Sequence, residues 1–352
     1  SSQSAHCNAH NLAAYIQAEK SFWKVLNLSV GVRFEYFNIT QPYFQGGGTV
    51  QREEESKPVF RAGANLKLAR GTFLKASFGQ GFRFPTMAEK YVRTQAGPIR
   101  IYPNDSLRSE SSWNAELGVK QVIVWGGFTG YLDLTGFVQQ FHRNIEFNFG
   151  MFGKLQDPLF GLGFSSINIG ETRVSGAEIT FAGRGKIGPF ELQTLCGYTY
   201  TQPISLNPDA PYPITTDGNT PLSYRKSGTA PEGNLLKYRF RHLAKGDIEL
   251  SRGGTSLGLS VRYNSFMENI DKVFVDLDQL LPFFDMPSPG LGKFRATHNK
   301  GVWITDFRIH VKLNRSTKLG LIINNLGNVE YALRPMVIES PRTTAVQVMI
   351  AF

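Results

Sequence analysis

Apolar and polar residues alternate with a period of two along most of the chain. Every second residue from Leu26 to Tyr36 is apolar, and the residues between them include Arg33 and Glu35. The same rule holds from Phe60 to Leu68 and, apart from one threonine, from Trp303 to Leu313. Successive side chains of a strand point to opposite faces, so this pattern predicts strands with one apolar and one polar face. A helix would scatter the same residues around its circumference.

The last ten residues repeat this alternation. Val346, Val348, Ile350 and Phe352 share one face of the predicted strand. In lipid, such a strand can close a ring of strands and place its final aromatic residue at the membrane interface. An edge strand of a soluble β-sandwich is the alternative for this stretch. We predict the barrel-closing role for these four residues.

Segments of this kind predict about thirteen strands, separated by short and long connections in strict alternation. The expected strands span residues 11–20, 25–38, 57–69, 72–84, 109–123, 127–145, 164–184, 189–201, 236–251, 254–270, 300–312, 316–325 and 343–352. The expected long loops span residues 39–56, 85–108, 146–163, 202–235, 271–299 and 326–342. Short connections at one end of the strands and long connections at the other are typical of an antiparallel up-and-down barrel in a membrane. The short turns then lie on the periplasmic side. We therefore predict an all-β, transmembrane β-barrel.

The odd strand number predicts an incomplete barrel, because single-chain bacterial barrels have even numbers of strands. No segment reads as a globular plug, and no run of eighteen apolar residues predicts a membrane-spanning helix. We expect residues 1–352 to be the C-terminal portion of one barrel domain. The missing strands would then come from the same polypeptide or from a second chain, since open edges are exposed to aggregation.

Aromatic residues near the strand ends are expected to form two belts at the membrane interfaces. These residues are Trp23, Tyr36, Trp113, Trp125, Tyr131, Tyr198, Tyr263 and Trp303.

The formal net charge of +10 at first favours a nucleic-acid partner. The basic residues are nevertheless spread one or two to a segment and alternate with apolar residues, so we expect no nucleic acid partner. A polar interior, or loops that face anionic ligands, accounts better for the surplus.

The cysteine content and the motifs exclude several chemistries. Cys7 and Cys196 are too few for a disulfide framework, and their redox state stays open. No spacing of cysteine or histidine predicts a metal site. No phosphate-binding loop or nucleophile motif is present, so we expect no enzyme activity.

Four motifs resemble segments of the TonB-dependent outer-membrane receptors, in the order in which that family has them. Residues 79–86 (GQGFRFPT), followed by 89–91 (EKY), resemble the family's strand-to-loop segment. Residues 107–118 (LRSESSWNAELG) resemble the next strand, and 168–178 (NIGETRVSGAE) an internal strand. Residues 324–331 (NNLGNVEY) resemble the C-terminal strand pair.

The resemblance implies a 22-stranded barrel in the bacterial outer membrane, with a plug in its lumen. It also implies import of a scarce ligand, such as an iron–siderophore complex, haem or a cobalamin-like corrinoid, driven by TonB through the plug. No covalently bound cofactor is implied. The plug and about nine early strands are missing from this chain. A non-transporting barrel that scaffolds a surface or secretion complex stays an alternative, as does a soluble β-sandwich binding module.

Charged residues on the polar faces of the strands must meet water or protein rather than lipid. We predict that they contact the plug, and the alternative for each residue is hydration of the barrel wall. The predicted plug-contacting residues are Arg33, Glu35, Arg61, Lys67, Arg83, Glu116, Glu178, Asp306 and Arg308.

The long loops carry the predicted ligand surface, because Arg and Tyr together suit an anionic, partly aromatic ligand. The predicted ligand-binding residues are Tyr91, Arg93, Arg100, Tyr102, Tyr224, Phe283, Phe284 and His298. An isolated histidine such as His298 is more often a packing residue than a haem ligand. Loop 146–163 is apolar enough to contact a surface lipoprotein or lid.

Overall fold

The structure is a computed structural model that describes residues 8–42, 50–96, 99–154, 156–157, 161–212, 222–230, 233–284, 287–288, 290–335 and 337–351. Within these residues, thirteen antiparallel strands form one continuous sheet, in the order β1-β2-β3-β4-β7-β8-β11-β12-β13-β14-β15-β16-β17. Each strand pairs with its neighbour in sequence or across a loop, as an up-and-down meander requires. The predicted all-β class is therefore confirmed.

The large sheet has long strands in its first half and shorter ones in its second. Their bounds are β1 (Asn8–Phe22), β2 (Leu26–Pro42), β3 (Val50–Ala69), β4 (Thr72–Arg83), β7 (Glu110–Trp125), β8 (Gly127–His142), β11 (Thr172–Ile187), β12 (Phe190–Ser205), β13 (His242–Arg252), β14 (Thr255–Asn264), β15 (Val302–Lys312), β16 (Thr317–Asn324) and β17 (Thr343–Ile350).

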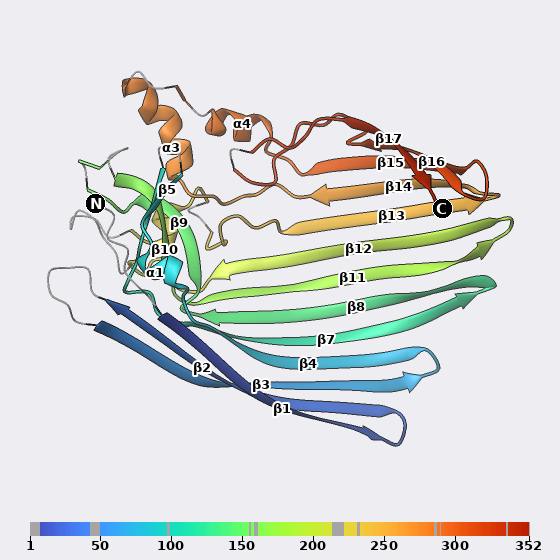
Figure 1. The fold of residues 1–352 in the computed structure, drawn as a ribbon, viewed down its shortest axis with the longest axis horizontal. Helices are drawn as coiled ribbons and strands as arrows, with labels where there is room; N and C mark the ends of the chain where they lie inside the picture. The colour runs from blue at the N-terminus through green and yellow to red at the C-terminus, as the bar shows by residue number, and fades with distance from the viewer. Residues whose placement is uncertain are drawn as a thin grey trace.

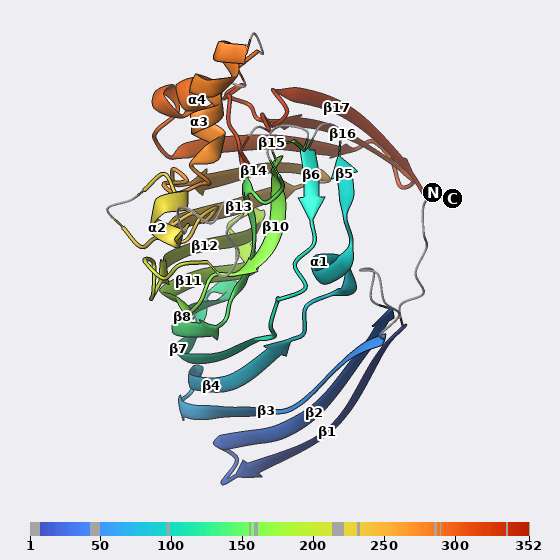
Figure 2. The same ribbon diagram turned by 90° about the vertical axis from the view of Figure 1, so that its left-hand side faces the viewer.

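The sheet is strongly curved and open (Figures 1 and 2). β1 and β17 form its two edges and do not pair with each other in the described part of the chain. None of the described helices is long and apolar enough to cross a membrane.

The two faces of the sheet differ in chemistry. Directly opposed residues in an antiparallel pair share a face, so the register can be followed from strand to strand. Glu116, for example, lies opposite Ser77 on β4 and Phe137 on β8. The face that does not carry Glu116 exposes large apolar side chains over the whole sheet, among them Val30, Phe60, Leu117, Leu134, Ile179, Ile248, Leu259, Val346 and Val348.

The connections are sorted by length, as the sequence predicts. At one end, six short turns join β1 to β2, β3 to β4, β7 to β8, β11 to β12, β13 to β14 and β15 to β16. Gly71, with φ of 85°, occupies a left-handed position in one of them that a residue with a Cβ atom rarely adopts. The long connections gather at the opposite end (Figure 1).

The long connections contain secondary structure that the alternation of apolar residues does not predict. A second sheet, in the order β5-β6-β10-β9, lies on the concave side of the large sheet (Figure 2). The remaining elements are short helices. The bounds of these elements are α1 (Met87–Tyr91), β5 (Thr94–Ala96), β6 (Ile99–Tyr102), β9 (Ile145–Met151), β10 (Leu162–Asn168), α2 (Tyr224–Ser227), α3 (Val273–Leu280), η2 (Leu281–Phe284) and α4 (Leu291–Thr297).

Four predicted details are wrong. The expected strand over 254–270 ends at Asn264. The expected strand over 164–184 is broken into β10 and β11 at Gly170, whose φ of 90° ends the extended backbone. The expected strand over 236–251 begins only at His242, because Tyr238 adopts a positive φ of 59°. Tyr131 is not a belt residue: it lies on the polar face, where Lys120 Nζ is 3.8 Å from its ring centre.

Candidate functional site

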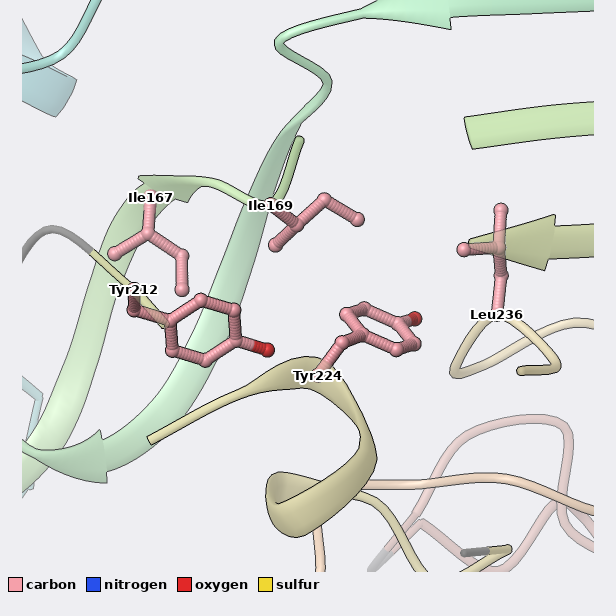
Figure 3. Close-up of a cluster of buried hydrophobic side chains, with 5 residues drawn as sticks. All are labelled: Ile167, Ile169, Tyr212, Tyr224 and Leu236. Atoms are coloured by element: carbon pink, nitrogen blue, oxygen red, sulfur yellow. The ribbon is translucent and has the colours of Figure 1, made fainter. Parts of the chain in front are cut away.

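The residues of interest lie in two places: the long loops at one end of the strands, and the polar concave face below them. The loops pack around two buried clusters of apolar side chains, and one of these unites β10, α2 and the segment before β13 (Figure 3). The loop end is therefore a folded body rather than a set of free connections.

α1 is anchored directly above the end of β4. Thr86 caps the helix by accepting a hydrogen bond from Glu89 N, and the Glu89 carboxylate accepts from Thr86 N at 2.8 Å. Arg83 Nη1 also donates to Glu89, at 3.0 Å. Burial would raise the pKa of the Glu89 carboxyl, but these hydrogen bonds outweigh it, and the pKa is lowered. Arg83, the last residue of β4, therefore joins the large sheet to the loop helix α1.

Glu53 holds the other side of α1. Its carboxylate accepts from Lys90 Nζ at 2.7 Å and from Tyr91 Oη at 2.9 Å. Lys90 is 2% exposed and also donates to Leu107 O. The predicted ligand residue Tyr91 thus uses its hydroxyl to join α1 to β3.

Arg93, Arg100 and Tyr102 come together at the small sheet. The Arg93 guanidinium lies 5.6 Å from the centre of the Tyr102 ring, and Arg100 Nη1 lies 2.8 Å from Asp157 Oδ1. The backbone N–H of Lys154 and the nearby Arg100 lower the pKa of Asp157. Arg93 is exposed and Tyr102 is buried, so Arg93 is the cation of this group that can reach a ligand.

A buried polar network joins three loops beside the cluster of Figure 3. Lys237 Nζ lies 2.5 Å from Asp271 Oδ1, and 0% and 1% of the two side chains are exposed. Lys237 also donates to Asn148 Oδ1 at 2.9 Å and to Ser227 Oγ at 2.8 Å. Tyr238 Oη donates to Asp271 at 2.5 Å. Ser227, Lys237 and Tyr238 belong to the connection between β12 and β13, whereas Asn148 lies on β9 and Asp271 follows β14. The network therefore holds three loops in one arrangement.

Tyr224 and Glu146 border this network. Tyr224 is 2% exposed, its hydroxyl donates to Glu146 Oε2 at 3.3 Å and it accepts from Lys237 N at 2.6 Å. Burial raises the pKa of Glu146 to about 7. Its second carboxylate oxygen has no partner in the described part of the chain. Tyr224 therefore serves packing, and we leave it out of the proposed ligand surface.

The remaining predicted loop residues lie apart from these groups. His298 is exposed after the end of α4, and its ring stacks on Phe294 at 4.1 Å. Phe283 and Phe284 belong to η2, but their side chains lie outside the described part of the structure. The structure does not bring the eight residues into one site. Within the described residues, no group of three His, Cys, Asp or Glu side chains is placed to hold a metal ion.

The nine charged residues predicted for the polar face all share one face by strand register. This face is the concave one, because Arg83 donates from it to Glu89 of α1, which lies on the concave side of the sheet (Figure 2). Several are paired within the wall: Arg33 with Glu35 at 2.6 Å, and Arg308 with Asp247 at 2.7 Å and Glu249 at 3.0 Å. Asp306 accepts from Arg262 at 3.2 Å. Contact of this face with a plug stays a prediction.

The predicted closing strand is β17, where Val346, Val348 and Ile350 lie on the apolar face and are more than half exposed. Phe352 and Cys7 lie outside the described residues, and Cys196 lies on the apolar face by register.

Sequence reasoning misses the residues that hold the loops, namely Lys237, Asp271, Glu146, Glu53 and Lys90. The one sequence signal is a charge inside a short apolar run, as at Lys237 after two leucines. That signal is weak, because the partner, Asp271, lies 34 residues further along the chain in another loop, where no local pattern connects the two residues.

The comparisons with known proteins agree with this architecture. Residues 1–326 match the sequence profile of the family described as TonB dependent receptor-like, beta-barrel. None of the curated proteins matches the sequence significantly.

Three solved structures illustrate the shared fold. The copper transporter OprC is 14% identical, with a TM-score of 0.66, over 98% of this chain and 48% of its own. The ferric-catecholate import receptor Fiu of E. coli K12 is 17% identical, with a TM-score of 0.65, over 99% and 45%. A variant of the Serratia marcescens hemophore receptor HasR, in complex with hemophore HasA and heme, is 16% identical, with a TM-score of 0.63, over 98% and 52%.

The chain spans about half the length of these structures. At such identities they show the fold alone, whereas the sequence profile covers nearly the whole chain. The sorted loops, the two-faced sheet and the profile lead to one conclusion: this chain belongs to the TonB-dependent receptor β-barrels of the bacterial outer membrane.

Proposed function

We propose that this chain forms the lumen wall and the ligand-facing loops of a TonB-dependent importer. The observation that carries the proposal is the concave face, which bears charged side chains from β2 to β15, such as Arg33, Glu116, Asp247 and Arg308, while the opposite face exposes large apolar ones. Charged side chains in a membrane need a wet or protein-filled lumen. The plug and the other strands would come from the rest of the polypeptide or from a second chain.

The charges of the concave face divide into two groups. Arg33, Arg308 and Asp306 have ion-pair partners on the wall. Arg61 and Lys67 have no carboxylate partner in the described part of the chain, and Glu116 and Glu178 accept only from hydroxyls, at 3.4 and 3.5 Å. We infer that this second group contacts the plug, because its charges would otherwise stay unpaired on the lumen side.

Cross-linking in the full receptor tests the plug contact. Glu178→Cys faces the lumen by register, whereas the neighbouring Ile179→Cys faces the opposite side and is the matched control. With a short bifunctional maleimide and a cysteine on the plug, we expect a plug adduct from position 178 only. Adducts from both positions, or from neither this nor any other lumen position, contradict the proposal.

The proposed ligand is an anionic chelate that approaches Arg93. Arg93 is exposed and stacked on Tyr102, which keeps its charge at the mouth of the lumen. The similar solved structures are a copper transporter, a ferric-catecholate import receptor and a hemophore receptor in complex with its hemophore and heme. The same chemistry, a charged metal complex, is what we propose for this chain.

Radioiron uptake by cells that carry the full receptor tests the ligand surface, with a panel of ferric siderophores and haem as probes. Arg93→Glu should lower uptake of whichever probe the unaltered receptor imports by about ten-fold or more, which is the loss expected when one charge contact with the ligand is removed. Lys24→Glu makes the same charge change at a short turn, at the other end of the strands, and should leave uptake unchanged. Equal uptake by both variants would remove Arg93 from the ligand surface.

A further inference from the structure

A cavity of about 340 Å³ lies at the loop end, between α4 and the segment 329–335. Its lining is mostly apolar and includes Phe266, Met267, Phe294 and Tyr331. Cavities of this size hold small molecules or part of a larger one. None of the residues around Arg93 lines it, and Val302 and the isolated His298 are the residues of the predicted lumen face and ligand surface that do. The import proposal built on Arg93 and the charged wall residues therefore gives the cavity no role.

The cavity carries more positive than negative charge. Arg295, Lys300 and Arg334 line it, against one acid, Glu330. Arg295 is held in the cavity lining by two contacts: its guanidinium lies 4.6 Å from the centre of the Phe266 ring, and it donates to Met267 O at 2.9 Å. Lys300 and Arg334 are exposed and have no ion-pair partner in the described part of the chain, so their charges are free to meet an anion.

The cavity borders the lipid-facing aromatic residues. Gly301 lines it, and a side chain at that position would overlap the Tyr263 ring. Tyr263 pairs with Trp303 across β14 and β15, with ring centres 4.7 Å apart, on the same face as Leu259. Trp303 is 58% exposed. Such aromatic pairs lie at head-group height, so the cavity is next to the polar surface of the outer leaflet.

We propose that this cavity binds a phosphate-bearing lipid of the outer leaflet, with an acyl segment between Phe266 and Phe294 and a phosphate between Lys300 and Arg334. An apolar lining beside unpaired cations matches an anionic amphiphile, and neither a neutral lipid nor a free anion uses both parts. The location beside Tyr263 brings such a lipid within reach without its leaving the membrane.

Native mass spectrometry of the full receptor tests this site, after reconstitution in phosphatidylcholine nanodiscs doped with lipid A. The double variant Lys300→Gln/Arg334→Gln should reduce retained lipid A by about 30-fold, as expected for two surface cations. Ala332→Trp keeps both cations but fills the cavity, and it should also reduce retention. Lys293→Gln removes an exposed cation of α4 that does not line the cavity, and it should change retention by less than about two-fold.

Three outcomes overturn the proposal. The first is equal retention of lipid A by the double variant and the unaltered receptor. The second is equal retention of lipid A from which both phosphates have been removed. The third is displacement of lipid A by inorganic phosphate alone at comparable concentration, which would indicate a site for a soluble anion. None of these results depends on uptake, so the site can fail while the import proposal stands.

Discussion

The ion pair of Lys237 and Asp271 is shut off from water, with 0% and 1% of the side chains exposed. Burying two charges is costly unless further hydrogen bonds complete the pair. Asn148 on β9 supplies one of those bonds, and Ser227 and Tyr238, from the same connection as Lys237, supply the others. At the scale of residues, the loop body therefore depends on a few polar groups, since removal of one leaves its partner charged in apolar surroundings.

Lys237→Met tests this dependence. The substitution leaves the Asp271 carboxylate buried without a counter-charge, so local stability should fall by about 3–5 kcal/mol. Amide hydrogen exchange should then speed up by about 100-fold or more at Phe149, whose N–H donates to Asp271 at 3.0 Å. Lys272→Met breaks the exposed pair with Asp276 and should cost less than about 1 kcal/mol. Similar effects of both substitutions would contradict the role of the buried pair.

Glu146 predicts a pH dependence of the same loops. Burial raises its pKa from the ordinary 4.5 to about 7, while Arg239 and Lys237 oppose the rise and Asp271 adds to it. The folded loops thus favour the neutral acid. Its stabilising effect is fully present below about pH 4.5 and is lost as the pH rises through 7.

Protection factors for the β9 amides, corrected for intrinsic exchange, should therefore fall between pH 5 and pH 8. Glu146→Gln keeps a neutral polar group at the position, so its protection should be nearly independent of pH over this range. A rise of protection with pH in the unaltered protein would show that the sign is wrong.

At the scale of elements, the strands follow from local pattern and the loops do not. Period-two alternation identifies all thirteen strands because each one faces lipid on one side and the lumen on the other. The fold of the loops depends on contacts such as Phe149 with Asp271, 122 residues apart, which no local pattern encodes. Tyr224 shows how this limits site prediction. The sequence predicts a ligand-binding aromatic residue in a loop, but in the structure Tyr224 is buried among residues from other loops.

α1 is an exception, because its capping box can be read directly from Thr86 and Glu89. Thr86→Ala removes the hydroxyl that accepts from Glu89 N, and it should destabilise the helix by about 1 kcal/mol. Amides of residues 89–91 should exchange about five-fold faster, as measured by mass spectrometry. Thr94→Ala, on the exposed strand β5, makes the same change without a cap and should have no such effect.

At the scale of the whole molecule, the sheet is an open wall with two free edges, β1 and β17. In an intact receptor, each edge would pair with a further strand, because unpaired backbone groups are costly in lipid. The curvature, the sorted loops and the two-faced sheet then have one explanation: hydrocarbon meets the apolar face, and water or protein meets the polar face. The profile match to the receptor family is independent support.

The most direct test of this explanation is spin-label accessibility in the full receptor in lipid, from single cysteines placed at Glu116 and Leu117 after replacement of Cys7 and Cys196. These neighbours lie on opposite faces by register, and Leu117 is 59% exposed on the apolar face. We predict that the label at 117 relaxes with oxygen, which concentrates in lipid, and that the label at 116 does not. A label at 116 that is accessible to oxygen, beside one at 117 that responds to a water-soluble nickel complex, would contradict the orientation of the wall.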